Sequence, residues 1–389
     1  MSETYDAIII GGGIYGTSLA FHLSKRGIKN IVLEKNFLAS GATGKSSGLV
    51  RMHYDSELES RLAWESFQYF INWKDMVGGD CGFTRTGFLE LIGKDYQNQL
   101  LANISMHQNI GIPAFIVDAN DVKRLAPSFY TEDLNLASYE PESGYADPSA
   151  TAASLMDAAR KNGSKLMQGI QVTGIQTSGG RVTGVETSQG PICGGVVVNT
   201  AGAWAASVGD MVGLHIPVDT WRHDTMFIRR PHDLGSSHPT VIDFIKSMYF
   251  RPETGSLTLV GLEDGNLIGD DPDGDTDLSR PGFVEKASDR ICERIPVMEQ
   301  GSLHSASGGF DGITPDQTPI LDQAGPDGFY LACGFSGTGF KIAPAVGVCM
   351  AELILDGQSK TVDISPFNLK RYDEGKHFRG ENAYESFWK

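Results

Sequence analysis

The spacing of apolar residues at the start of the chain predicts a strand, a helix and a second strand. Tyr5–Ile10 is a short β-branched apolar run, as in a buried parallel strand. Apolar residues then recur with helical spacing from Ile14 to Arg26, and Gly27 is placed to end that helix. Asn30–Leu33 is a second short apolar run. This order of elements is typical of an α/β fold with a parallel sheet.

Two later parts of the chain have different patterns. The segment TGFLELIG at 86–93 and the stretch from 239 to 262 alternate between apolar and polar positions, as strands of an antiparallel sheet do. The run IAPAVGVCMAELIL at 342–355 is apolar almost throughout and predicts a packed helix. The sequence therefore predicts an α/β (α+β) fold that combines a parallel and an antiparallel sheet.

The turn between the first strand and the first helix carries a dinucleotide-binding motif. Residues 11–16 read GGGIYG and fit GxGxxG, and Glu34 stands at the end of the next strand. The strand before, the helix after and the acidic residue beyond make the motif specific. Gly11 allows the tight turn, Gly13 lets a pyrophosphate approach the backbone, and Gly16 lets helix and strand pack closely. The helix N-terminus favours phosphate, and Glu34 can accept hydrogen bonds from both hydroxyls of an adenosine ribose.

Composition and charge narrow the class of protein. The 389-residue chain has 40% hydrophobic and 21% charged residues, which is ordinary for a soluble globular protein. Its net charge of −16 argues against nucleic acid or an anionic membrane surface as the main partner. The first apolar run is far too short for a signal peptide or a membrane span. The five cysteines include no CxxC pair, so we expect reduced thiols, no metal site and a cytoplasmic location.

The segment after Glu34 distinguishes between two dinucleotides. In an NAD-binding protein the chain would usually continue directly into another helix and strand. Here a loop of small residues, Ser40–Gly48, follows the acidic residue first. This arrangement is similar to the second contact strip of the glutathione-reductase-type FAD folds.

Several passages resemble the D-amino-acid oxidase superfamily, and within it the branch of sarcosine oxidase, glycine oxidase and dimethylglycine dehydrogenase. Besides the small-residue loop they are IQVTGIQTSGGRVTGVETSQG, VVVNTAGAWAASVG, and GFDGITPDQTPILD followed by GFYLACGFSGTGFKIAPAVG. They occur in the family's order between Tyr5 and about Phe367. The resemblance implies a glutathione-reductase-type FAD-binding Rossmann domain interleaved with an antiparallel-sheet substrate domain. The FAD-binding domain would take 1–82, 145–218 and 302–375, the substrate domain 83–144 and 219–301, and the C-terminal tail 376–389.

The resemblance also implies which residues contact FAD. Val172 would touch the adenine through its backbone, and the glycine-rich loop that ends at Lys341 would present backbone N–H groups to the flavin ring. The residues expected to bind FAD are Gly11, Gly13, Ile14, Tyr15, Gly16, Glu34, Lys35, Ser40, Gly41, Ala42, Lys45, Ser46, Ser47, Gly48, Leu49, Val172, Ala201, Gly202, Trp204, Gly309, Gly334, Phe335, Ser336, Gly337, Thr338, Gly339, Phe340 and Lys341.

Two departures from the family bear on how FAD is held. In monomeric sarcosine oxidase a cysteine shortly before the Thr-Pro-Asp motif bonds covalently to the flavin, and counting back from Thr314 places Gly309 there. The histidine attachment of the dimethylglycine dehydrogenase type belongs in the first loop, where this chain has Gly44 and Lys45. The resemblance therefore implies noncovalent FAD.

The same resemblance implies a clamp for a substrate carboxylate, made by Arg51 after the small-residue loop and Lys341 at the end of the glycine loop. An arginine fork binds a carboxylate bidentately and a lysine adds a point charge. Tyr249 falls where the family places a pocket tyrosine, and His223 is a further candidate. The alternatives are a surface salt bridge for Arg51, a snorkelling side chain for Lys341, a core aromatic for Tyr249 and a merely hydrogen-bonded His223.

The oxidases of this branch place a lysine above the flavin to speed the reaction with oxygen. Alignment of SLTLVGLEDG puts Leu259 at that position and Glu263 at a pocket histidine. Glu263 would then pair with a cationic amine or simply end the strand. The electron acceptor is therefore either oxygen or an electron-transfer protein. The acidic stretch Gly269–Gly282 lacks the closing glutamate of a calcium loop and predicts a solvated loop.

Together the resemblance and the residues predict oxidation of the C–N bond of a small secondary or tertiary amino acid, such as sarcosine, dimethylglycine or proline. Hydride transfer to flavin N5 would give an imine that water hydrolyses. One alternative is oxidation of a 2-hydroxy acid, with His223 as the base. Another is a noncatalytic FAD-binding subunit, which co-purification with a partner and no reaction with any amine would favour. The sequence is compatible with an oligomer or a heteromeric partner.

Overall fold

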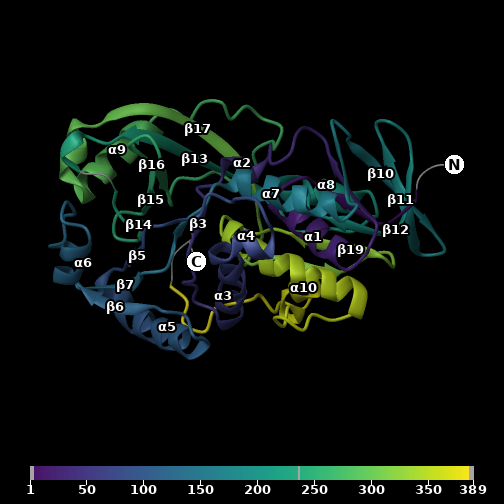
Figure 1. Cartoon of the computed structure of the whole chain (residues 1–389), viewed down its shortest axis with the longest axis horizontal. Helices are drawn as coiled ribbons and strands as arrows, with labels where there is room; N and C mark the ends of the chain where they lie inside the picture. The colour runs from purple at the N-terminus through teal and green to yellow at the C-terminus, as the bar shows by residue number, and fades with distance from the viewer. Residues whose placement is uncertain (1–3, 235–236, 385–389) are drawn as a thin grey trace.

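The computed structural model describes residues 4–234 and 237–384, whose strands form two large sheets in an elongated body (Figure 1). The first sheet has eight strands in the order β10-β11-β12-β1-β2-β9, with β19 beside β12 and β18 beside β19. Its strands are β1 (Thr4–Ile10), β2 (Asn30–Glu34), β9 (Lys165–Gln168), β10 (Val172–Ser178), β11 (Arg181–Thr187), β12 (Ile192–Asn199), β18 (Ile320–Gln323) and β19 (Phe329–Cys333).

The centre of the first sheet is parallel. β1 pairs in parallel with β2 on one side and β12 on the other, so Ile8 lies between Ile31 and Val197. β9 and β19 extend the parallel part, and β10 and β11 add an antiparallel hairpin. The strands predicted from the first two apolar runs are confirmed.

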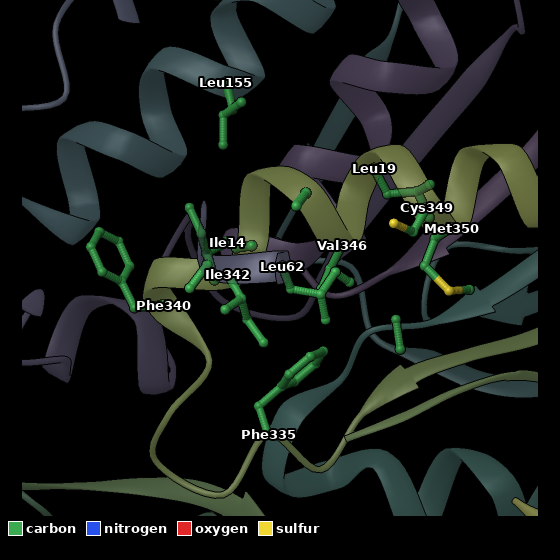
Figure 2. Packing of buried hydrophobic residues seen from close by; sticks show 14 of the residues in the cluster. Ile14, Leu19, Leu62, Leu155, Phe335, Phe340, Ile342, Val346, Cys349 and Met350 are labelled. Carbon is green, nitrogen blue, oxygen red and sulfur yellow. The ribbon is translucent and has the colours of Figure 1, made fainter. Parts of the chain in front are cut away.

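Four helices pack together on this sheet: α1 (Ile14–Lys25), α3 (Glu57–Ile71), α7 (Pro148–Lys161) and α10 (Ala343–Asp356). Figure 2 shows Leu19 of α1 beside Cys349 and Met350 of α10, with Leu62 of α3 and Leu155 of α7 in the same apolar cluster. Apolar burial of this kind is the main source of helix stability in proteins. The packed helix predicted at the C-terminal apolar run is confirmed as α10.

The second sheet also has eight strands, in the order β17-β13-β16-β15-β14-β5-β7-β6, and all its pairs are antiparallel except β14 with β5. α9 (Phe283–Arg294) covers it with an apolar face that includes Ala287 and Ile291. The strands are β5 (Phe88–Leu91), β6 (Phe115–Asp118), β7 (Leu136–Glu140), β13 (Asp219–Arg229), β14 (Thr240–Asp243), β15 (Met248–Glu253), β16 (Leu257–Leu262) and β17 (Ser302–Ile313). The predicted combination of a parallel and an antiparallel sheet is confirmed.

The chain passes several times between the two large sheets, and no described strand belongs to both of them. β17 lies in the second sheet, where it pairs along β13, although the predicted boundary at 302 assigns it to the FAD-binding domain. The domain boundaries therefore stay a prediction. Between the sheets lies a small sheet of β3 (Leu49–Val50), β4 (Thr84–Arg85) and β8 (Gly144–Tyr145).

The remaining helices are short or peripheral. They are α2 (Ala42–Lys45), α4 (Trp73–Met76), α5 (Gln97–Ile110), α6 (Ala119–Leu125), α8 (Ala205–Asp210) and α11 (Lys370–Asp373). Within the described ranges, no helix combines the length and the apolar character that crossing a bilayer requires. No disulfide joins any of the five cysteines, all of which are described. The tail predicted at 376–389 follows α11, and its last five residues lie outside the described part.

Candidate active site

A cavity of about 420 Å³ runs between the two sheets and is lined by segments from the whole length of the chain. At one end lie Glu34 and Val172 of the first sheet, and at the other lie Arg51, Tyr249 and Lys341. The carboxyl ends of parallel strands open on the cavity, as ligand sites of open α/β sheets do.

The turn after β1 forms one wall of the cavity. A side chain at Gly16 would place its Cβ 2.0 Å from the carbonyl oxygen of Gly11, so only glycine lets α1 start this close to β1. The backbone N–H of Ile14 points into the same region and donates to Thr43 Oγ1 over 2.9 Å. The helix N-terminus therefore faces the cavity, where its N–H groups and dipole favour phosphate.

The carboxylate of Glu34 lies at the far end of the cavity and is already oriented by the backbone. Its two oxygens accept from the N–H groups of Gly12 and Asn36, each over 2.8 Å. A carboxylate oxygen has a second lone pair, so both oxygens can still accept hydroxyl groups of a ribose. Val172 lines the cavity beside it, at the start of β10.

The acidic loop 269–282 covers the cavity near Glu34. This loop connects β16 of the second sheet to α9. Asp273 of that loop accepts from Lys35 Nζ over 2.5 Å and from Trp204 Nε1 over 3.1 Å. Lys35 Nζ also lies 3.8 Å from the centre of the Trp204 ring. Most residues of the loop are exposed, as expected for a solvated loop, but it is also fixed by Arg222, which donates to the carbonyls of Asp275 and Leu278 over 3.1 and 2.8 Å.

The glycine-rich loop 334–341 forms the opposite wall and is held in place by tyrosine and aspartate. The ring of Tyr15 stacks on that of Phe335 at 3.4 Å and 7°, and its hydroxyl donates to the carbonyl of Gly339. Asp311 of β17 accepts from the N–H of Gly337 over 2.7 Å. A Cβ at Gly339 would lie 2.5 Å from Tyr15 Oη, so the loop approaches the α1 turn only because that position is glycine.

Two cations meet at the substrate end of the cavity. Arg51 and Lys341 are buried, and both lie over the ring of Tyr54, with the guanidinium carbon 5.0 Å and Nζ 4.8 Å from its centre. Lys341 Nζ and the Tyr54 hydroxyl both donate to the carbonyl of Thr338, over 3.0 and 2.8 Å. Burial, with Arg51 second, lowers the pKa of Lys341 well below its ordinary value. An anion between the two cations would therefore be favoured strongly.

Buried acids stand behind the two cations. Burial raises the pKa of Glu90 to about 7, and that of Glu140 also to about 7, while Arg51 opposes the shift in both. Glu140 accepts from the Met52 N–H over 2.9 Å and from Ser143 Oγ over 2.6 Å. These acids lie next to the segment that carries Arg51. Because each has a pKa of about 7, the net charge around Arg51 changes close to neutral pH.

Three further polar side chains face the same end of the cavity from the second sheet: Tyr249 of β15, Glu263 after β16 and His223 of β13. Burial and then Glu263 raise the pKa of Tyr249, which keeps the phenol protonated. Burial, with Asp243 second, raises the pKa of Glu263 well above its ordinary value. Burial lowers the pKa of His223 to about 3, so its imidazole is neutral at neutral pH.

Almost all residues predicted for the site line this cavity. The exceptions are Gly16, Gly48 and Ser336, which lie behind the lining; Ser336 Oγ, for example, accepts from the Thr314 N–H over 3.1 Å. Leu259 is buried in an apolar cluster with Phe88 and Tyr249. The lining also includes residues that the sequence reasoning missed, among them Thr43, Thr200, Asp273, Phe310 and Asp311. Of these, Thr43 stands inside the small-residue loop and could have been inferred from it.

The comparison that decides the family is a match over most of the chain. The profile of the family described as FAD dependent oxidoreductase matches residues 6–353. The chain belongs to this family. The FAD-dependent oxidoreductase resemblance inferred from the motifs is therefore confirmed, and with it the expectation that the chain is an enzyme.

Relatives of this FAD-dependent oxidoreductase include a sarcosine dehydrogenase, a sarcosine oxidase subunit and an L-proline dehydrogenase. The chain is 28% identical to the mitochondrial sarcosine dehydrogenase of Mus musculus over 100% of its own length and 44% of that protein, so it spans less than half of this relative. It is 27% identical to sarcosine oxidase subunit beta of Rhodobacter capsulatus, covering 96% of this chain and 90% of that one. The structure of L-proline dehydrogenase from P. horikoshii matches with a TM-score of 0.90 at 27% identity, covering 97% and 100% of the two chains.

The residues of the cavity fit FAD. The α1 N-terminus would hold the pyrophosphate, Glu34 the ribose and the 334–341 loop the flavin ring, since these three groups face one continuous cavity. The close approach of the backbone at Gly16 leaves the turn bare of side chains where phosphates would lie.

Proposed function

We propose that this oxidoreductase oxidises the C–N bond of a small secondary or tertiary amino acid, such as sarcosine, dimethylglycine or proline. The observation that carries the proposal is the pairing of Arg51 with Lys341 over the Tyr54 ring at one end of the cavity. Two buried cations in one small space repel each other unless an anion lies between them. The amino-acid and amine substrates named for the relatives agree with an α-carboxylate in this position.

In this proposal the protein binds the substrate, orients it and excludes water from around it. Arg51 and Lys341 hold the carboxylate, which points the amine end of the molecule toward the second sheet and its Tyr249. FAD, when bound, supplies the two-electron acceptor for the C–N bond, and water then hydrolyses the released imine. The protein contributes positioning, because no side chain has to form a covalent bond with the substrate.

We also propose that FAD is held without a covalent bond. Gly309 lacks a side chain that could bond to the flavin, and a Cβ there would lie 2.6 Å from Cβ of Lys45. The acceptor of the electrons is proposed to be oxygen or an electron-transfer protein. Leu259, where the oxidases have a lysine, favours the electron-transfer protein. The likeness to a beta subunit supports a heteromeric partner, and the proposed location is the cytoplasm.

We expect anaerobic mixing with N-methyl or cyclic amino acids to bleach the flavin band of the yellow protein. The test is a panel of these amines beside D-amino acids and 2-hydroxy acids, followed by absorbance. Bleaching by one amine class supports the proposal and names the substrate class, and admission of air then shows whether oxygen is the acceptor. Bleaching by 2-hydroxy acids alone would contradict it.

One observation favours oxidation of a 2-hydroxy acid as the second candidate. His223 lines the cavity, and burial keeps its imidazole neutral, so it could accept a hydroxyl proton. Replacing His223 by Gln would then abolish reduction by hydroxy acids while leaving reduction by amines. If no compound in the panel reduces the flavin, the noncatalytic FAD-binding subunit becomes the better interpretation.

The clamp should bind a carboxylate more weakly as the pH rises through 7. Above that pH Glu90 and Glu140 lose their protons, since burial raises each pKa to about 7. Both deprotonations add negative charge beside the two cations, so the sign is the same for each. Acetate, which has no amine to titrate, is the probe, and its dissociation constant is read from the flavin absorbance between pH 6 and pH 9, roughly the range in which such groups titrate.

Glu140→Gln should flatten this pH dependence, because the amide cannot ionise. The control is Glu142→Gln, which removes a carboxylate that pairs with Arg85 at the surface, with 38% of its side chain exposed. If the acetate affinity of the wild type is constant, or rises with pH, the proposal that Glu90 and Glu140 control the charge of the clamp is wrong.

A further inference from the structure

The C-terminal segment 377–384 follows α11 and runs from Asp316, shortly before β18, to His53, two residues after Arg51. At its start, the N–H of Phe378 donates to Asp316 Oδ2 over 2.9 Å, and the Phe378 ring lies 5.2 Å from that of Phe367. Asp316 is itself paired with Arg371 at 2.8 Å. The segment is therefore anchored where it leaves the body of the protein.

The middle of the segment lies against the chain that follows Arg51. The N–H of Asn382 donates to the carbonyl of Asp55 over 3.3 Å, and Glu381 accepts from the N–H of Glu57 over 3.0 Å. A Cβ at Gly380 would lie 2.4 Å from Cγ of Asp55, so the two backbones are in close contact. The segment also contacts α5, where Asn103 Nδ2 donates to the carbonyl of Asn382 over 3.3 Å.

Tyr384 ends the described segment in a buried position, with 6% of its surface exposed. Its hydroxyl lies 3.0 Å from Nε2 of His53, and its ring packs on those of His53, Phe244 and Tyr96 at 6.0, 5.6 and 6.0 Å. Nε2 of His53 is also 2.6 Å from Glu90 Oε2, and both side chains are 1% exposed. Tyr384 and Glu90, the buried acid behind Arg51, thus contact the same buried nitrogen of His53.

His53 is linked to Arg51 in two ways, by the backbone of Met52 between them and by Glu90, which interacts with both residues. Met52, the residue between them, is fixed by its N–H bond to Glu140 at 2.9 Å. Arg51 is the leading charge that opposes the burial of Glu90, so the guanidinium and the carboxylate share one environment. The segment after Arg51 is therefore held at Met52 by Glu140, and at His53 by Glu90 together with Tyr384 of the C-terminal segment.

We propose that the C-terminal segment completes the carboxylate clamp, with Tyr384 as a positioning residue that holds His53 and, through it, Arg51. The inference rests on the proposed function, because it assumes that Arg51 binds the substrate carboxylate. If the segment only covered the surface, phenylalanine would serve as well as tyrosine at its buried end. A buried hydroxyl lowers stability unless it has a hydrogen-bond partner. In this protein that hydroxyl reaches the histidine beside Glu90.

The first test compares Tyr384→Phe with the wild-type holoprotein by acetate titration of the flavin absorbance. Removing one buried hydrogen bond should weaken acetate binding about fivefold. It should raise KM for the amino acid by the same factor with little change in kcat, because Tyr384 does not touch the reacting atoms. The FAD content should stay that of the wild type, and the thermal unfolding temperature should fall by no more than about 2 °C, because one buried hydrogen bond contributes about 1 kcal/mol. The matched control is Tyr130→Phe, which removes an exposed hydroxyl that donates to Glu132.

The second test moves the segment without touching Tyr384. Gly380→Ala puts a methyl group against Asp55 and should weaken acetate binding at least as much as Tyr384→Phe does. Gly93→Ala is its control, because a Cβ there has no heavy atom within 4 Å.

The outcomes separate the two proposals. Wild-type protein that does not bind acetate would overturn the clamp and the positioning role together. Wild-type protein that binds acetate, with Tyr384→Phe and Gly380→Ala binding it equally well, would overturn the positioning role alone. Weaker acetate binding that accompanies lost FAD and an unfolding temperature lowered by clearly more than about 2 °C in Tyr384→Phe would assign the tyrosine a structural role and overturn the proposal as well.

Discussion

Replacing Arg51 by methionine is expected to lower kcat/KM for the amino-acid substrate by roughly 30- to 5,000-fold. The guanidinium is buried beside Tyr54 and Lys341, so a carboxylate bound there would lose its main partner in a site with little water. Removing one partner of such a buried charge pair costs about 2–5 kcal/mol, and this free-energy range converts to the expected loss of kcat/KM. Steady-state kinetics with the amine identified in the anaerobic panel measures the effect.

Arg51→Lys should fall between the wild type and Arg51→Met, because lysine keeps the charge but loses the bidentate geometry. The control is Arg85→Met, which removes an arginine whose partner is Glu142 and whose side chain is 58% exposed. FAD content must be measured in each variant, so that lost cofactor is not read as lost substrate binding. An Arg51→Met protein with normal kcat/KM and full FAD would show that the carboxylate binds elsewhere.

Replacing Gly16 by alanine should reduce the FAD content of the purified protein at least tenfold. The new methyl group would lie 2.0 Å from the Gly11 carbonyl and 2.9 Å from Thr200 Oγ1, so the turn would have to open. Overpacking of this kind costs about 1–3 kcal/mol, and about 1.4 kcal/mol already corresponds to a tenfold change in affinity. The ratio of flavin to protein absorbance reports the loss, and titration with added FAD separates weak binding from misfolding.

The control for this variant is Gly195→Ala in β12, where a Cβ meets no heavy atom within 4 Å. It makes the same chemical change in the same sheet and should leave FAD binding intact. Full FAD content in Gly16→Ala would mean that the turn tolerates a side chain and that close backbone packing is not what the motif requires.

The sequence predicts best where the local pattern and the function depend on the same residues. The β1–α1 turn with its glycines and Glu34 can be derived from spacing alone, because a dinucleotide needs that geometry at that place. Arg51, Tyr249 and Lys341 come from the resemblance to a family, since no periodicity relates positions so far apart. The structure brings all of them to one cavity.

The rest depends on packing that no single segment encodes. Asp273 reaches Lys35 and Trp204 only because the second sheet folds over the first. Asp311 fixes the glycine loop only because β17 runs beside it. Glu90, in a strand with an ordinary alternating pattern, becomes a group with a pKa of about 7 only when burial and Arg51 act on it together. Such groups acquire their properties from neighbours distant in sequence.

Separate parts of the protein would contact the carboxylate and the amine of a bound amino acid. The carboxylate clamp stands on the segment after β3 and on the loop before α10, whereas Tyr249, Glu263 and His223 come from the second sheet. A change in that sheet can therefore alter which amine is accepted while the anchoring of the carboxylate stays intact. Directed evolution of new substrate ranges would then best be confined to β13, β15 and the residues after β16, with the anchoring segments left unchanged.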